Sequence, residues 1–138
     1  MKISIITLFP NMIEGFFAES IIKRAVEKNL VEIEIINLRN FAVDDYGSVD
    51  DRPYGGGAGM VLRVEPVVKA LKSLKSKVKS LKSKIILTSA KGKTYNQSRA
   101  QEYAKLEHIV LIAGHYEGFD ERVLEYIDEE VSLGDFVM

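Results

Sequence analysis

A glycine-rich segment, Arg52–Gly59, carries the strongest local signal for chemistry in the sequence. It reads Arg-Pro-Tyr-Gly-Gly-Gly-Ala-Gly, and its glycines let backbone N–H groups approach a ligand closely. Arg52 can bind a phosphate or a carboxylate through two parallel hydrogen bonds. The segment lacks the Lys-Ser/Thr ending of a nucleoside-triphosphate loop and does not directly follow an expected strand, which disfavours an ATPase or a dehydrogenase. A flexible glycine-rich connector is the alternative interpretation.

A second group of polar residues, Gly114–Arg122, directly follows an apolar run that we expect to be a buried strand, His108–Ala113. Ligands of open α/β sheets bind outside the carboxyl ends of the strands, which is where this group would lie. Tyr116 and Glu117 offer a hydrogen-bonding hydroxyl and a proton-accepting carboxylate. The following residues, Asp120–Arg122, are equally compatible with a solvated helix start.

Two further expected strand ends carry glycine or other small residues. Leu87-Thr-Ser89 closes one strand, and Ser132-Leu-Gly134 lies near the end of another. We expect these two bends to meet the bend at Gly114, because the carboxyl ends of parallel strands lie at one edge of a sheet. Together they can line a pocket for a flat ligand that is held mainly by main-chain groups. The residues alone do not name that ligand.

The apolar pattern predicts an α/β fold, with a mostly parallel sheet and helices on both faces. A long segment without periodicity, Leu38–Gly59, is expected to be a loop. The expected strands are Lys2–Leu8, Val31–Asn37, Lys84–Ser89, His108–Ala113 and a fifth that begins at Val131. The expected helices are Met12–Asn29, Met60–Ser73 with Pro66 in its first turn, Lys69–Lys84, Asn96–Leu106 and Phe119–Ile127.

The chain has 138 residues, a formal net charge of −1, two histidines and no cysteine. One domain is expected from this length, and a metal site is not expected from this set of ligands. The apolar runs are too short to span a bilayer, and the lack of cysteine suits the cytoplasm. Lysines in Lys69–Lys84 can lie along a phosphate backbone, although a solvated helix face is the favoured interpretation. The acidic run Glu125–Glu130 is interpreted as a solvated turn.

Four segments along the whole chain strongly resemble the bacterial tRNA guanine-N1 methyltransferases, which are knotted enzymes of the SPOUT superfamily. These segments are Phe9–Met12, Asp51–Met60, Ala113–Arg122 and Ile127–Met138. The resemblance implies that residues 1–138 form a SPOUT-type domain, with a trefoil knot, that binds S-adenosylmethionine. It also implies methyl transfer from S-adenosylmethionine to N1 of the guanosine 3′ of the anticodon in tRNA. The family acts as a cytoplasmic homodimer.

The resemblance also assigns roles to individual residues. A supporting catalytic role falls on Glu117. The methyl-donor pocket falls on Leu87, Thr88, Ser89, Gly114, Tyr116, Glu117, Leu133, Gly134, Phe136 and Met138. Substrate-binding roles fall on Asp50, Arg52, Tyr54, Gly55, Gly56, Gly57 and Gly59.

Members of this family continue past Met138 with a segment that completes the knot and with a smaller tRNA-binding domain. The resemblance places the principal catalytic base, an aspartate, and a nearby arginine in that later part. We therefore expect an incomplete knot and very low methylation activity for these 138 residues alone. The alternative is a non-catalytic fragment for dimerisation or RNA docking, which would use the basic stretch Lys69–Lys84.

Overall fold

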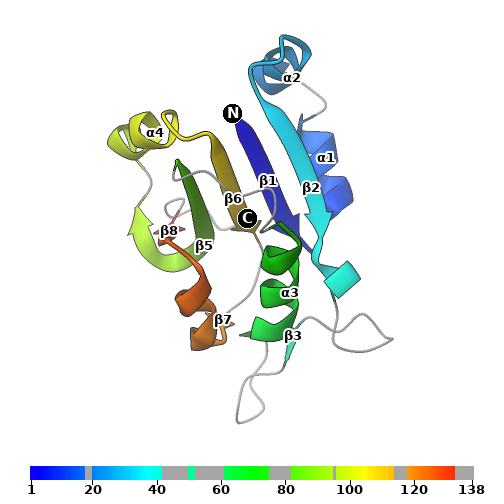
Figure 1. The fold of residues 1–138 in the computed structure, drawn as a ribbon, viewed down its shortest axis with the longest axis vertical. Helices are drawn as coiled ribbons and strands as arrows, with labels where there is room; N and C mark the ends of the chain where they lie inside the picture. Colours follow the sequence, from blue (N-terminus) through cyan, green and yellow to red (C-terminus); the bar gives the residue numbers. More distant parts are fainter. Residues whose placement is uncertain are drawn as a thin grey trace.

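A parallel β-sheet forms the centre of the fold. The computed structural model of the chain describes residues 1–17, 20–41, 50–51, 61–74, 82–94, 96–113 and 118–132. The strands of the central sheet are β1 (Lys2–Thr7), β2 (Glu32–Asn37), β5 (Ser83–Thr94), β6 (His108–Ala113) and β8 (Glu129–Ser132). Within the described residues their order is β2-β1-β6-β5-β8, and every neighbouring pair is parallel (Figure 1). The expected α/β fold with a mostly parallel sheet is thereby confirmed.

The remaining elements surround this sheet. The helices are α1 (Pro10–Phe17), α2 (Ser20–Glu27), α3 (Val64–Leu74) and α4 (Gln97–Tyr103), with 3-10 helices η1 (Leu38–Phe41) and η2 (Glu121–Tyr126). A small second sheet contains β3 (Asp50–Asp51), β4 (Val61–Leu62) and β7 (Gly118–Phe119).

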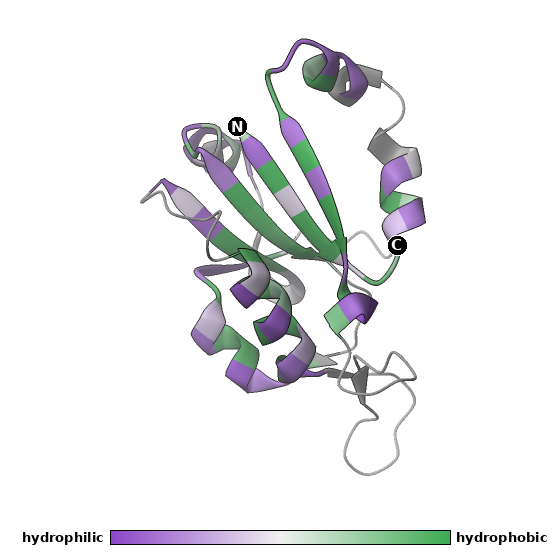
Figure 2. Cartoon of the chain, turned by 45° about the vertical axis from the view of Figure 1, so that its right-hand side comes forward, coloured by the Kyte–Doolittle hydropathy of each residue, from purple (hydrophilic) through white to green (hydrophobic). Residues whose placement is uncertain are grey.

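Helices cover both faces of the central sheet because alternate residues of each strand point in opposite directions. In β6, Val110 and Ile112 belong to the apolar cluster that contains α3, with Val67 of α3 fully buried. Ile109 and Leu111 of the same strand pack on the other face, in the cluster that contains Tyr103 of α4. Figure 2 shows hydrophobic stretches alternating with hydrophilic ones along several central strands, and helices of mixed hydropathy. Burial of these two clusters is the main stabilising contribution to the fold.

A buried polar pair joins β1 to β6 near the amino ends of these strands. Ser4 Oγ lies 2.8 Å from His108 Nε2, and both side chains are buried. Burial lowers the pKa of His108, and the nearby charge of Lys2 lowers it further. The neutral imidazole is therefore favoured in the folded protein.

The expected helix Met12–Asn29 is wrong in its bounds, because two helices, α1 and α2, occupy this stretch. The apolar spacing continues through both helices and so does not reveal the division. Asn29 ends the second helix with a positive φ of 59°, a conformation that asparagine tolerates better than most residues. The amide of Leu30 then donates to the carbonyl of Ala25.

Three other expected bounds also need correction. The expected helix Lys69–Lys84 is wrong at its end, because β5 starts at Ser83; residues 75–81 of this stretch lie outside the described residues. The expected strand Lys84–Ser89 is too short, because β5 continues through Gly92 to Thr94. The expected helix at Phe119–Ile127 is a short strand followed by the 3-10 helix η2. Lysine and serine fit either a helix or a strand edge, so composition alone could not place the start of β5.

Candidate functional site

The carboxyl ends of β6, β5 and β8 lie side by side at one edge of the sheet. Leu87 of β5 pairs with Ile112 of β6, one residue before that strand ends. On the other side of β5, Thr88 pairs with Val131 of β8. The three bends that the sequence predicted to meet therefore follow three neighbouring parallel strands. Such an edge is the usual ligand-binding position of an open α/β sheet.

The described donor candidates at the end of β5 differ in what they can offer a ligand. Leu87 is only 3% exposed, and its side chain packs in the apolar cluster with α3. Only its main chain is therefore in a position to contribute to a binding site. The hydroxyl of Thr88 donates to the main-chain carbonyl of Ile112 at 3.3 Å, which ties the end of β5 to the end of β6. This arrangement suits a site made of main-chain groups, as the sequence predicted.

The second half of β5 packs tightly against β8. Val131 is paired with both Thr88 and Lys93, so the β5 residues between them form a bulge in the regular ladder. A Cβ atom on Gly92 would lie 2.5 Å from the main-chain nitrogen of Val131 and 2.6 Å from the carbonyl carbon of Glu130. Only glycine permits this approach without a backbone shift. The bulge that starts at Ser89 is thus held against β8.

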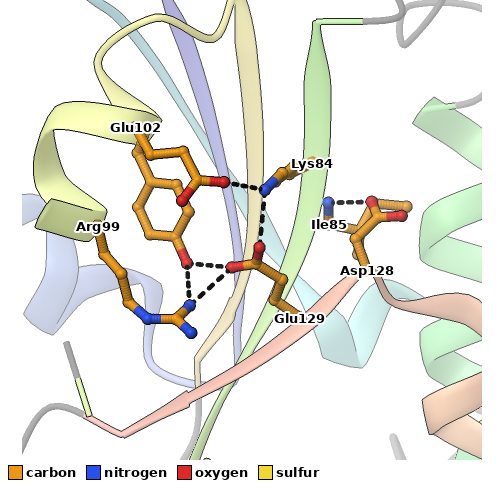
Figure 3. A network of polar contacts seen from close by, with 7 residues as sticks. Lys84, Ile85, Arg99, Glu102, Asp128 and Glu129 are labelled. Atoms are coloured by element: carbon orange, nitrogen blue, oxygen red, sulfur yellow. Dashed lines mark hydrogen bonds and ion pairs between the residues drawn. The ribbon is translucent and has the colours of Figure 1, made fainter. Parts of the chain in front are cut away.

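A network of charged side chains joins β5, α4 and β8 (Figure 3). Lys84 Nζ lies 2.7 Å from Glu102 Oε1 and 2.7 Å from Glu129 Oε1. The other carboxylate oxygen of Glu129 accepts from Arg99 Nη1 at 3.0 Å and from the Tyr103 hydroxyl. Glu129 is half-buried, with a side chain 23% exposed, and lies in β8, so the solvated turn expected for Glu125–Glu130 is wrong at this residue, whereas Glu125 and Asp128 are exposed.

The pKa values of this network follow from its hydrogen bonds. Burial raises the pKa of Glu129, but hydrogen bonds from Lys84 and Tyr103 outweigh it, so the net pKa is lowered. Hydrogen bonds to Glu102 and Glu129 raise the pKa of Lys84. Glu129 and the two cations, Lys84 and Arg99, are therefore charged at neutral pH. Sequence reasoning missed this network because its members are spread over 46 positions and only the folded sheet brings β8 beside β5.

Asp120 caps η2 rather than facing a ligand. Its carboxylate accepts from the Arg122 amide at 3.0 Å and lies 2.6 Å from Arg122 Nη2. The hydrogen bonds from Arg122 lower the pKa of Asp120 to about 2. Arg122 Nη2 is also 3.9 Å from Glu65 of α3. Of the two interpretations of Asp120–Arg122, the structure therefore supports the helix start.

Comparison with known proteins decides the family. The sequence model described as tRNA (Guanine-1)-methyltransferase TrmD matches residues 1–138. The chain belongs to this family. It is 55% identical over 139 residues to a tRNA (guanine-N(1)-)-methyltransferase of Mycoplasma mycoides and 51% identical over 138 residues to one of Clostridium botulinum. These matches cover 100% of this chain and 56% of each relative, so the chain spans little more than half their length.

The fold agrees with that of a solved member of the tRNA (guanine-1)-methyltransferase family. A tRNA methyltransferase from Aquifex aeolicus matches with a TM-score of 0.87 and 39% sequence identity. The match covers 100% of this chain and 62% of that protein.

The structure describes only part of the residue set expected for this family. Leu87, Thr88 and Ser89 lie in β5, and Asp50 lies in β3, where it pairs with Leu62 of β4. The other candidates lie outside the described residues. The knot is expected around residues 132–138, and of these the structure describes Ser132. These candidates are Arg52, Tyr54, Gly55, Gly56, Gly57, Gly59, Gly114, Tyr116, Glu117, Leu133, Gly134, Phe136 and Met138.

Within the described ranges, no group of three or more histidine, aspartate or glutamate side chains is arranged to hold a metal ion. No helix in this part of the chain combines the length and hydropathy that a bilayer crossing requires.

Proposed function

We propose that this chain forms the S-adenosylmethionine-binding part of a tRNA (guanine-N1)-methyltransferase. The enzyme transfers a methyl group to N1 of the guanosine 3′ of the anticodon. The observation that carries the proposal is the meeting of the β6, β5 and β8 carboxyl ends at one sheet edge, in a chain of this family. A parallel sheet with helices on both faces places ligands at such an edge.

The described residues fit a donor that is held through main-chain groups. The β5–β6 ladder ends at Leu87, so the main chain from Thr88 onward has left that partner strand. Gly92 allows close packing on β8 of the bulge that starts at Ser89. S-adenosylmethionine supplies an electrophilic methyl group when it is bound there. We assign its binding to the described residues Leu87–Ser89, together with Gly114, Tyr116, Glu117, Leu133, Gly134, Phe136 and Met138.

Guanine N1 loses its proton when it accepts the methyl group, so a proton acceptor must lie within hydrogen-bond reach. We assign a supporting part in this step to Glu117, whose position in the sequence follows the carboxyl end of β6 by four residues. Its carboxylate can accept a hydrogen bond from the base.

The tRNA substrate is assigned to the glycine-rich segment and its neighbours. Glycine backbones allow close approach to the target base, and an arginine can bind a phosphate. The enzyme would act as a homodimer in the cytoplasm, where its tRNA is found. The residues assigned to this role are Asp50, Arg52, Tyr54, Gly55, Gly56, Gly57 and Gly59.

Isothermal titration calorimetry with S-adenosylhomocysteine tests the donor site. We expect saturable binding by the chain, weakened at least about tenfold, or ~1.4 kcal/mol, by Gly114→Val. Gly15→Val is the matched control, because Gly15 lies in α1 with no heavy atom within 4 Å of an added Cβ. Circular dichroism checks that both variants are folded. Absence of saturable binding by the unsubstituted chain would overturn the proposal.

A further inference from the structure

We infer that Glu129 is a positioning residue for the donor-binding edge, which is the sheet edge at the carboxyl ends of β6, β5 and β8. Glu129 lies at the start of β8 and fixes this strand to β5 and α4, and the carboxyl end of β8 helps form the edge. This inference rests on the proposed function. Glu129 itself is not assigned to the donor pocket.

The carboxylate of Glu129 is held by three donors from two elements (Figure 3). Lys84 of β5 binds one oxygen, at 2.7 Å, whereas Arg99 and Tyr103 of α4 bind the other. The side chains of Lys84 and Arg99 are only 25% and 18% exposed. Ion pairs that are shielded from water in this way are less screened than surface pairs and have a more defined geometry.

The network is also balanced in charge. Two cations, Lys84 and Arg99, face two carboxylates, Glu102 and Glu129, with the Tyr103 hydroxyl as an additional donor. Neutralising Glu129 leaves Arg99 without its carboxylate and removes one of the two partners of Lys84. Each remaining group would then reorient toward water, since a shielded cation without a counter-charge is unfavourable.

The strand that Glu129 holds pairs with a single neighbouring strand in the described part of the sheet. β8 is four residues long and lies at the end of the sheet order, so within the described residues it pairs with β5 alone. Its regular ladder with β5 is interrupted after Thr88. A second attachment precedes it, where Asp128 exchanges two 2.8 Å hydrogen bonds with the main chain of Ile85. Glu129 therefore adds a side-chain attachment one residue farther along the chain, three residues before Ser132.

The apolar packing beneath β8 does not depend on Glu129. Val131 is 2% exposed and packs with Ile86 and Tyr103 in its own cluster. We therefore expect a Glu129 variant to fold, with β8 attached but less firmly aligned. A small displacement at a binding edge is costly, since about 1 Å of misplacement at a reacting centre can cost roughly a hundredfold in rate.

The test compares three glutamate-to-glutamine variants of the chain. We expect Glu129→Gln to weaken S-adenosylhomocysteine binding about tenfold by calorimetry, below the ~100-fold limit just given. Glu102→Gln changes the same network without touching β8, and its side chain is 54% exposed. Glu130→Gln removes a charge from the next position of β8, where Oε2 is buried and has no hydrogen-bond partner in the structure. Both control variants should retain affinity within about twofold, a margin that corresponds to only ~0.4 kcal/mol.

Amide hydrogen exchange provides a second measurement that does not require a ligand. Exchange should become faster in β8 for Glu129→Gln and should stay unchanged there for Glu102→Gln, while β1 keeps its protection in both. Unchanged affinity and unchanged β8 exchange in Glu129→Gln would overturn the inference, even if its melting temperature fell. If the unsubstituted chain does not bind S-adenosylhomocysteine, the proposed function is contradicted instead. The exchange measurement then tests only whether Glu129 positions β8.

Discussion

The hydroxyl of Thr88 donates a 3.3 Å hydrogen bond to the main-chain carbonyl of Ile112, across the boundary between β5 and β6. This bond lies at the end of the β5–β6 ladder, whose last pair is Leu87 and Ile112. It therefore holds β5 and β6 together at the point where their ladder stops.

Thr88→Val should lower the free energy of unfolding by about 1 kcal/mol, because valine keeps the shape of threonine but cannot donate. Thr88→Ser retains the hydroxyl and should lose less. Urea unfolding monitored by circular dichroism measures both variants. No loss for valine together with a loss for serine would show that the methyl group of Thr88, and not its hydroxyl, makes the contribution.

Gly92→Ala should destabilise the protein by about 1–3 kcal/mol, the range typical of overpacked sites. The added Cβ would meet the main chain of Glu130 and Val131 at less than 3 Å, and main chain cannot rotate away as a side chain can. Gly15→Ala is the matched control, since space around Gly15 is open and alanine favours the helix by up to ~1 kcal/mol. Thermal unfolding of both variants should shift in opposite directions. A Gly92→Ala protein as stable as Gly15→Ala would contradict the close approach of β5 to β8.

Asn96→Ala should cost about 1 kcal/mol of stability, which is the usual value of a helix N-cap. The Asn96 side chain accepts from the amide of Arg99 at 2.9 Å at the start of α4. Asn96→Ser supplies another capping oxygen and should lose much less. Chemical denaturation distinguishes the two, and similar losses would mean that this cap does not stabilise α4.

Stability should fall as the pH falls below about 6.5, the ordinary pKa of histidine. The pKa of His108 is lowered in the folded protein, so in this range the unfolded chain binds the proton more readily than the folded one. This contribution is complete above pH 6.5 and is lost as the pH falls through the lowered value. Urea unfolding between about pH 7.5 and 5.5 stays above the range in which most carboxylates titrate.

His108→Gln is the comparison for this pH dependence, because glutamine can still bond to Ser4 but does not titrate. Its stability should change less over the same pH range than that of the unsubstituted chain. The pKa itself is accessible by nuclear magnetic resonance in a His115→Gln protein, since the chain has two histidines and this variant keeps one imidazole. A His108 titration at or above the ordinary value would refute the assignment.

The strands were the most predictable part of the fold. The apolar runs at Lys2–Leu8 and His108–Ala113 predicted β1 and β6 almost to the residue, because a parallel strand buried on both faces requires an unbroken apolar stretch. Helix bounds were less predictable. The apolar spacing in Met12–Asn29 continues through two helices, and the helical pattern expected over Lys69–Lys84 runs into β5, which starts at Ser83.

The candidate edge was predictable in outline because it depends on strand order and small residues near strand ends. The contacts that hold it together were not. Lys84 and Glu129 are 45 positions apart, and no local pattern links them until β5 and β8 become neighbours. The expected strand Lys84–Ser89 stops before Gly92, since glycine commonly marks a loop. Gly92 instead lies inside β5, where it permits the close approach of two main chains.

The order of the strands has a consequence for how the protein is made. Ser4 and His108, which bond to each other, are 104 sequence positions apart, and β1 obtains its β6 partner only at that distance. At roughly 5–20 residues per second, a ribosome needs about 5–20 seconds to supply the missing strand. Throughout that interval an apolar segment near the amino terminus of the nascent polypeptide has one side uncovered. Early recruitment of chaperones to emerging chains should therefore matter more for this protein than for one whose sheet is assembled from successive hairpins.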